Sequence, residues 1–215
     1  MSRQLRRGFT LIEILIVVAI MAVLLAMAGL SAGGMMDAIR MKDAIETARY
    51  QVENARQLAM TQNREVIIRI YREPNEFNEP VWRTVEFGIS DVVTNPLDPE
   101  YTDPTSASYI PPFKRIGSAQ RLPTGYVFHP SSTYSTLLGN NSALYSGEET
   151  GSDNVSREYK AFTCQPDGKS NLPGSENWTL TVVKERDIQG SSALPPNFAV
   201  LELNANTSRM RVYRP

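Results

Sequence analysis

The strongest pattern in the sequence is an unbroken apolar stretch from Phe9 to Leu30, whose only ionisable side chain is Glu13. As an α-helix, about 22 residues with a rise of about 1.5 Å each span roughly 33 Å, enough to cross a bilayer core of about 30 Å. Basic residues precede the stretch and no acidic residue does; they are Arg3, Arg6 and Arg7. Because arginines favour the cytoplasmic side, residues 9–30 are predicted to be a single-pass transmembrane helix with a cytoplasmic N-terminus.

Residues 31–64 are predicted to continue this helix as an amphipathic segment. Apolar positions recur there at alternating spacings of three and four, which places them on one narrow stripe of a surface helix. The stripe consists of Ile45, Ala48, Val52, Ala55 and Ala59. Because alanine permits close approach, we expect a β-sheet to pack across it.

The remainder, residues 65–215, is predicted to form a β-rich extracytoplasmic head. Alternating and β-branched runs bounded by turn residues predict strands; they cover residues 65–72, 81–87, 126–129, 159–164, 178–184, 198–203 and 209–213. Two stretches, 90–125 with many prolines and 130–158 with many Ser, Thr, Asn and Gly residues, are expected to be long surface loops outside the core. The fold class is therefore α+β, with a long N-terminal α-helix packed on an antiparallel β-sheet.

Composition narrows the function classes. The formal net charge of the chain is −1, which gives no sign of a nucleic-acid protein at the level of the whole chain. The single cysteine, Cys164, has no partner for an internal disulfide. Together with the single histidine, His129, it does not provide enough ligands for a Cys/His metal cluster. Nucleophile-elbow, phosphate-loop and HExxH motifs are missing. We therefore expect no enzyme, metal site or cofactor.

A secretory signal peptide is the first alternative interpretation of the N-terminus. It would also have a basic start, an apolar stretch and a small-residue cleavage site, here Ala26-Met27-Ala28. The apolar stretch is longer than a usual signal core, and Glu13 lies inside it, where a carboxylate is costly and usually functional. An ordinary secreted or anchored binding protein remains the alternative.

The residues Arg6-Arg7-Gly8-Phe9-Thr10-Leu11-Ile12-Glu13 resemble the leader junction of type IV pilins and type II secretion pseudopilins. The resemblance implies that residues 1–8 are a basic leader peptide, that a prepilin peptidase cuts between Gly8 and Phe9, and that the new amine of Phe9 is methylated. A carboxylate buried in an apolar bundle needs a partner. We therefore expect Glu13 to pair with the Phe9 amine of a neighbouring subunit, so that the helix becomes the assembly element of a filament.

Within that family, three further segments are similar to the GspH/FimT minor pseudopilins and pilins: Glu53 to Arg64 leading into Val66, Phe162 to Gly168, and Ser208 to Val212. The resemblance implies a minor structural subunit of a type II secretion pseudopilus or a type IV pilus. Its partners would be prepilin peptidase, other pilins or pseudopilins, and the inner membrane. The head would be periplasmic first, and the assembled subunit would belong to a periplasmic pseudopilus or an extracellular pilus.

A DNA-binding minor pilin is the second alternative. Some members of the resembled group capture DNA through a C-terminal Gly-Arg-x-Arg motif, which Ser208-Arg209-Met210-Arg211 matches except at Ser208. In a strand, alternation puts Arg209, Arg211 and Tyr213 on one face, and Arg214 follows. These cations could contact phosphates, but arginines on an edge strand also prevent edge-to-edge aggregation.

Overall fold

The computed structural model describes residues 9–90, 110–151, 154–188 and 193–215, without the side chains of residues 26–33. The chain divides into two units, residues 1–40 and residues 41–215. One helix, α1 (Leu11–Gln62), contributes to both units. Within the part of the chain that the structure describes, none of the helices is both long enough and apolar enough to cross a membrane. Part of the predicted membrane segment 9–30 has side chains outside this description.

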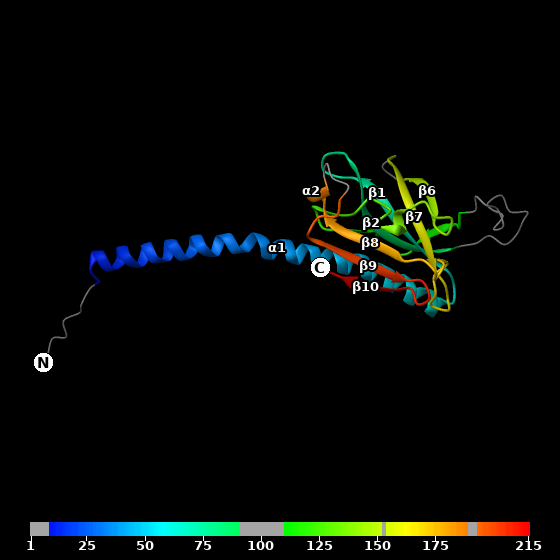
Figure 1. Cartoon of the computed structure of the whole chain (residues 1–215), viewed down its shortest axis with the longest axis horizontal. Helices are drawn as coiled ribbons and strands as arrows, with labels where there is room; N and C mark the ends of the chain where they lie inside the picture. The colour runs from blue at the N-terminus through cyan, green and yellow to red at the C-terminus, as the bar shows by residue number, and fades with distance from the viewer. Residues whose placement is uncertain (1–8, 91–109, 152–153, 189–192) are drawn as a thin grey trace, which may run out of the picture. The chain divides into compact units, whose positions relative to one another are not determined.

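The second unit is an α+β head built on one antiparallel sheet (Figure 1). The strands are β1 (Val66–Pro74), β2 (Pro80–Ser90), β3 (Phe113–Arg115), β4 (Gln120–Arg121), β5 (Tyr126–Phe128), β6 (Tyr145–Thr150), β7 (Ser156–Cys164), β8 (Trp178–Lys184), β9 (Phe198–Asn204) and β10 (Arg209–Tyr213). Their order in the sheet is β10-β9-β8-β5-β2-β1-β7-β6, and β3 and β4 pair with β2. The described residues of the head also form two short helices, η1 (Thr136–Leu138) and α2 (Glu185–Ile188).

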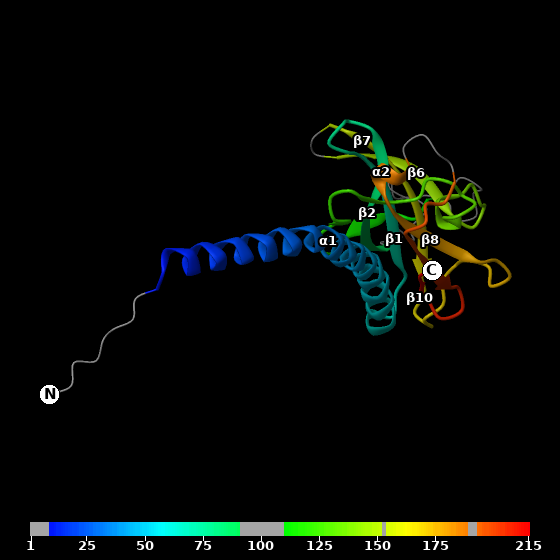
Figure 2. The same ribbon diagram turned by 60° about the vertical axis from the view of Figure 1, so that its left-hand side comes forward.

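The core lies between the sheet and the C-terminal half of α1, which runs along the sheet in both views (Figures 1 and 2). The whole alanine-rich stripe predicted for this half is buried, together with Met41 and Ala44. The helix ends where Asn63 takes a left-handed conformation, with φ of 50°, and the Arg64 amide donates to the Ala59 carbonyl at 3.3 Å. This is the usual geometry of a capped helix C-terminus. It directs the chain straight into β1.

Strand β1 is covered on both faces. Val66, Ile68 and Ile70 belong to the core against α1, whereas Ile67 and Tyr71 belong to a second apolar cluster with Tyr159 and Ala161 of β7. Successive side chains of a strand point to opposite faces, so this second cluster lies on the face of the sheet away from α1. Apolar side chains therefore pack on both faces of the sheet, and the face away from α1 also carries ionised side chains.

The two predicted long loops need correction. Stretch 90–125 includes β3 and β4, and Leu122 is buried in the core; residues 91–109 lie outside the described residues. Stretch 130–158 includes η1, β6 and the beginning of β7, and it buries Leu137, Leu138 and Leu144. The expectation that these stretches lie outside the core was therefore wrong, because a few leucines anchor segments that are otherwise polar.

Candidate functional site

The first turn of α1 contains a capping box made by Thr10 and Glu13. The Glu13 carboxylate accepts hydrogen bonds from the Thr10 amide at 2.8 Å and from the Thr10 hydroxyl at 2.9 Å. In return, the Glu13 amide donates to the Thr10 hydroxyl oxygen at 3.4 Å. A Thr-x-x-Glu box satisfies backbone donors that have no partner inside the helix. Glu13 therefore has a structural role within its own chain, which the spacing Thr10-x-x-Glu13 encodes but which we did not predict.

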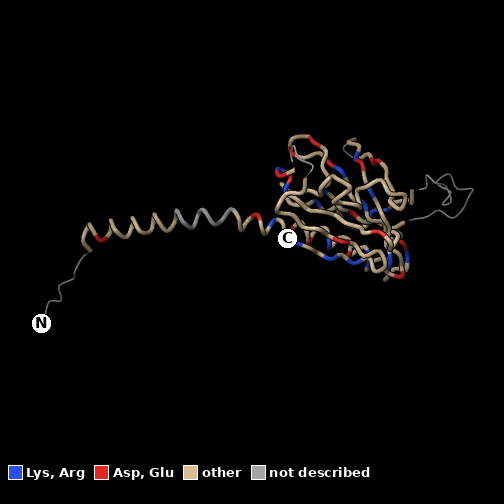
Figure 3. Tube along the Cα trace, viewed as in Figure 1, with Lys and Arg blue, Asp and Glu red and all other residues tan. Residues whose placement is uncertain are grey.

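The helix that follows this box presents a continuous apolar surface. Large apolar side chains between Phe9 and Leu25 are exposed by 47% to 84%. In Figure 3, the coloured trace of α1 before its grey part is almost entirely uncharged, whereas the trace after the grey part is mixed in charge. A helix that is apolar on all sides is normally covered by protein or lipid. The described part of this chain does not supply that cover.

The predicted cleavage junction falls only partly within the structure. Gly8 and the rest of residues 1–8 lie outside the described residues. Phe9 is described; it is exposed and precedes the first helical residue, Leu11. Its backbone is therefore outside the regular hydrogen bonding of α1.

The C-terminal arginines lie on β10, an edge strand that pairs with β9. Arg209, Arg211 and Tyr213 are exposed, whereas Met210 is buried, as the predicted alternation requires. Arg214 follows the strand and is also exposed. Arg211 is opposite Glu202 of β9 in the register, and a carboxylate at that position weakens the local positive potential. Whether this face contacts nucleic acid stays a prediction.

Ser208 has the backbone conformation of a glycine. Its φ is 48°, in the left-handed region that side chains other than Gly, Asn and Asp rarely enter. The residue is buried at the turn between β9 and β10. A second contact fixes the same turn, because Arg56 of α1 donates from Nε to the Thr207 carbonyl at 2.7 Å. Position 208 therefore has a backbone conformation that glycine would adopt without steric cost.

The single histidine is buried directly after β5. The Ser131 amide donates to His129 Nδ1 at 3.1 Å, and Tyr134 packs edge-on against the ring with centroids 4.9 Å apart. Burial lowers the pKa of His129 below its usual value. Within the described ranges, His, Cys, Asp and Glu do not gather into a group of three or more that could hold a metal ion. The absence of enzymatic activity stays a prediction.

Residues 3–29 match the family described as the prokaryotic N-terminal methylation motif. The match covers most of the predicted leader, the junction, the capping box and most of the apolar stretch. It supports a type IV pilin-like precursor. Neither the curated proteins nor the solved structures contain a match to this chain.

Proposed function

We propose that this chain is a minor structural subunit of a type II secretion pseudopilus or a type IV pilus. In this proposal prepilin peptidase cuts between Gly8 and Phe9, and the Phe9 amine is methylated. Residues 9–30 hold the subunit in the inner membrane before it assembles with other pilins or pseudopilins. The methylation motif over residues 3–29 is the observation that carries the proposal. The uncovered apolar surface from Phe9 to Leu25 supports it, because such a surface needs a lipid or protein environment.

The cleavage site tests this proposal directly. The mature protein, purified from membranes of its native host, should start at Phe9 in N-terminal sequencing and carry one extra methyl group in its intact mass. Two matched variants separate the alternatives. Gly8→Leu should block processing, whereas Ala28→Leu should leave it unchanged, because only a signal peptidase would require the small residue at position 28. A mature chain that begins at Gly29 would show ordinary secretion and refute the subunit assignment.

Glu13 is proposed to set the register of assembly through its charge, in addition to capping its own helix. A carboxylate offers about four acceptor sites, so the bonds from Thr10 leave room for the Phe9 amine of a neighbouring subunit. Pairing this amine with Glu13 would neutralise both charges in an apolar bundle, where an isolated charge is costly. The same carboxylate would then serve the chain before assembly and the filament after it.

Three substitutions distinguish the two roles of Glu13. Glu13→Val removes the cap and the charge, Glu13→Gln keeps a cap acceptor but removes the charge, and Thr10→Ala removes the cap partner but keeps the charge. If the charge sets the register, Val and Gln should both abolish cross-linking to neighbouring subunits in cells, and Thr10→Ala should retain most of it. Normal cross-linking of Glu13→Gln would reduce the role of Glu13 to helix capping. All three variants should still fractionate with membranes.

DNA binding by β10 is the second candidate function, and the left-handed backbone of Ser208 beside the exposed Arg209 and Arg211 favours it. A mobility-shift assay on residues 41–215 should show salt-sensitive binding that Arg209→Ala with Arg211→Ala removes, because phosphate contacts weaken as salt rises. A control that replaces two exposed arginines elsewhere, Arg49 and Arg186, changes the net charge equally. If both double variants lost DNA binding equally, the binding would be nonspecific electrostatic attraction between the head and DNA.

A further inference from the structure

The face of the sheet away from α1 holds a network of ionised side chains beside the second apolar cluster. Its base is formed by β1 and β2, where Tyr71 is opposite Thr84 and Arg69 is opposite Glu86 in the register. Alternation along β1 places Glu73 on the same face as Tyr71, and the register shift between Tyr71 and Arg72 lies opposite an extra residue of β2, Arg83. Strands β3, β6 and β7 contribute the arginines and the glutamate that complete the network.

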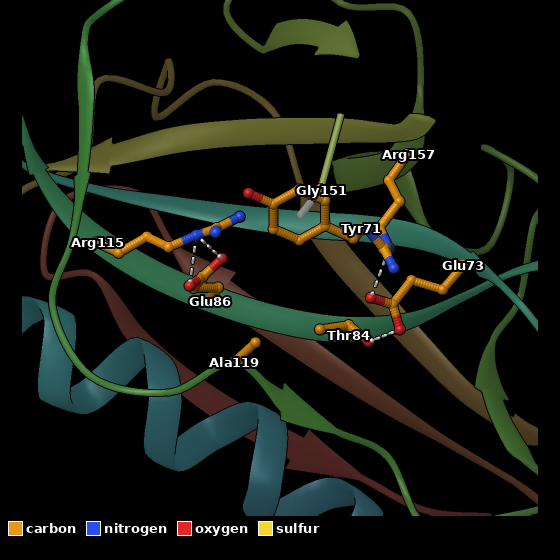
Figure 4. A pocket seen from close by; sticks show the side chains of 8 residues that line it. All are labelled: Tyr71, Glu73, Thr84, Glu86, Arg115, Ala119, Gly151 and Arg157. Atoms are coloured by element: carbon orange, nitrogen blue, oxygen red, sulfur yellow. Dashed lines mark hydrogen bonds and ion pairs between the residues drawn. The ribbon is translucent and has the colours of Figure 1, made fainter. Parts of the chain in front are cut away.

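A cavity of about 320 Å³ lies in the middle of this network, lined by side chains from β1, β2, β3 and β7 and by two loop residues, Ala119 and Gly151 (Figure 4). Its volume is at the small end of the usual range for ligand pockets. Figure 4 shows Arg115 with Glu86 on one side, Arg157 with Glu73 on the other, and Tyr71 between them. All of these residues belong to the unit 41–215, so the site is independent of the N-terminal segment.

Each carboxylate of the cavity is paired with an arginine. Arg115 Nε lies 3.0 Å from Glu86 Oε1, and Arg157 Nε lies 3.3 Å from Glu73 Oε1. Glu73 also accepts the Thr84 hydroxyl hydrogen bond at 2.7 Å. Behind this layer, Arg115 Nη2 lies 2.8 Å from Glu149 Oε1. Glu73 has a second arginine partner outside the lining, because Arg121 Nε lies 2.8 Å from Glu73 Oε2. The lining itself carries two glutamates and two arginines.

These carboxylates are ionisable groups that are largely removed from solvent. The side chains of Glu86 and Glu73 are only 5% and 9% exposed, and burial raises the pKa of Glu86 while the Arg115 charge opposes that shift. Removing ionised groups from water costs several kcal/mol each, and apolar residues of similar volume often give an equally stable protein. Buried, perturbed ionisable groups around a cavity are typical of functional sites.

The pairing of charges decides which kind of ligand fits. An ionic ligand would have to compete with existing ion pairs, and displacing Arg115 would leave the buried Glu86 carboxylate without its arginine, which is strongly unfavourable. A neutral hydroxyl can donate to a carboxylate and accept from a guanidinium without breaking the pair, because a carboxylate has about four acceptor sites and a guanidinium five N–H donors. Tyr71 and Ala119 supply apolar lining for a C–H surface. We propose that this cavity binds a neutral, polyhydroxylated ligand, a saccharide unit of one or two rings.

The test uses the full chain in a detergent without a sugar headgroup. The labelled protein is applied to an array of neutral glycans, acidic glycans and amino acids, and each signal is competed with the free saccharide to distinguish the sugar from its linker. We expect binding to neutral saccharides with a Kd of about 1 mM or tighter. Glu86→Gln should weaken it about tenfold or more, as expected for one hydrogen bond to a charged group.

Two further variants keep the result interpretable. Ala119→Trp fills the cavity from an exposed loop position and breaks no ion pair, so it should abolish binding with no loss of thermal stability. Glu158→Gln is the matched control, because Glu158 pairs with Arg72 on the same sheet without lining the cavity. The proposal is overturned if neutral saccharides do not bind, if acidic glycans or amino acids bind better, or if Ala119→Trp leaves binding unchanged.

Discussion

Cys164 should be almost unreactive towards thiol reagents while the head is folded. It is 0% exposed at the end of β7, opposite Val66 of β1. Burial raises its pKa to about 11, whereas a cysteine in an unfolded chain has a pKa of about 8.5. Only the thiolate reacts. At pH 8 the thiolate fraction is therefore roughly one in a thousand in the folded protein and about one in four in the unfolded chain.

Folding therefore lowers the thiolate fraction of Cys164 about 200-fold at pH 8. Steric burial adds to this effect, since the reagent reaches the sulfur only when the core opens. If opening costs about 5 kcal/mol, a low value for a whole domain, protection reaches several thousandfold. The chain contains one cysteine, so every modified thiol reports on this position.

The measurement follows modification by Ellman's reagent at pH 8, in native buffer and in urea. Cys164→Ala combined with Ser118→Cys moves the thiol to an exposed loop position, and this variant should react in native buffer nearly as fast as the unfolded wild type. It also shows that detergent does not block the reagent. A native rate for the wild type within about tenfold of the rate in urea would refute the reasoning, because it would require an accessible, ordinary thiol.

Three further predictions concern the stability of the head. Ala55→Leu should lower the free energy of unfolding by about 1 to 3 kcal/mol, because Ala55 is fully buried against the sheet; Gln57→Leu on the exposed side of α1 should change it by less than about 0.5 kcal/mol. Urea titration followed by tryptophan fluorescence measures both, and equal effects would contradict the close packing. Ser208→Gly should be more stable than Ser208→Ala by about 1 kcal/mol, because only glycine accepts a left-handed backbone without cost; a more stable alanine variant would contradict that conformation. Folding lowers the pKa of His129, so as the pH drops this imidazole is protonated in the unfolded chain before it is protonated in the folded protein. The free energy of unfolding should therefore fall as the pH drops through about 6.5. His129→Gln should remove that part of the pH dependence in thermal unfolding between about pH 7.5 and 5.5.

The organisation of the chain was predictable wherever it depends on local periodicity. The C-terminal half of α1 with its alanine-rich stripe, and strand β10, follow from spacings of three to four and of two residues, which also indicate which side chains are buried. Strand β8 was predicted as well, but six of its seven residues are buried, which alternation alone does not indicate. The leader junction and the Thr10-x-x-Glu13 box are likewise contained in a few consecutive residues. The box was missed because Glu13 was interpreted only through its burial in an apolar segment.

Tertiary structure decided what depends on distant partners. Strands β3, β4 and β6 are short or polar, and they exist because β2 and β7 offer backbone hydrogen bonds beside them. The cavity joins Tyr71 and Glu73 with Thr84, Arg115 and Arg157, so its members come from separate strands. In the sequence each of these residues looks like a solvated side chain. Whether a charge is exposed or buried beside its counter-charge is set by the pairing register of strands far apart in the chain, and local sequence patterns do not specify that register.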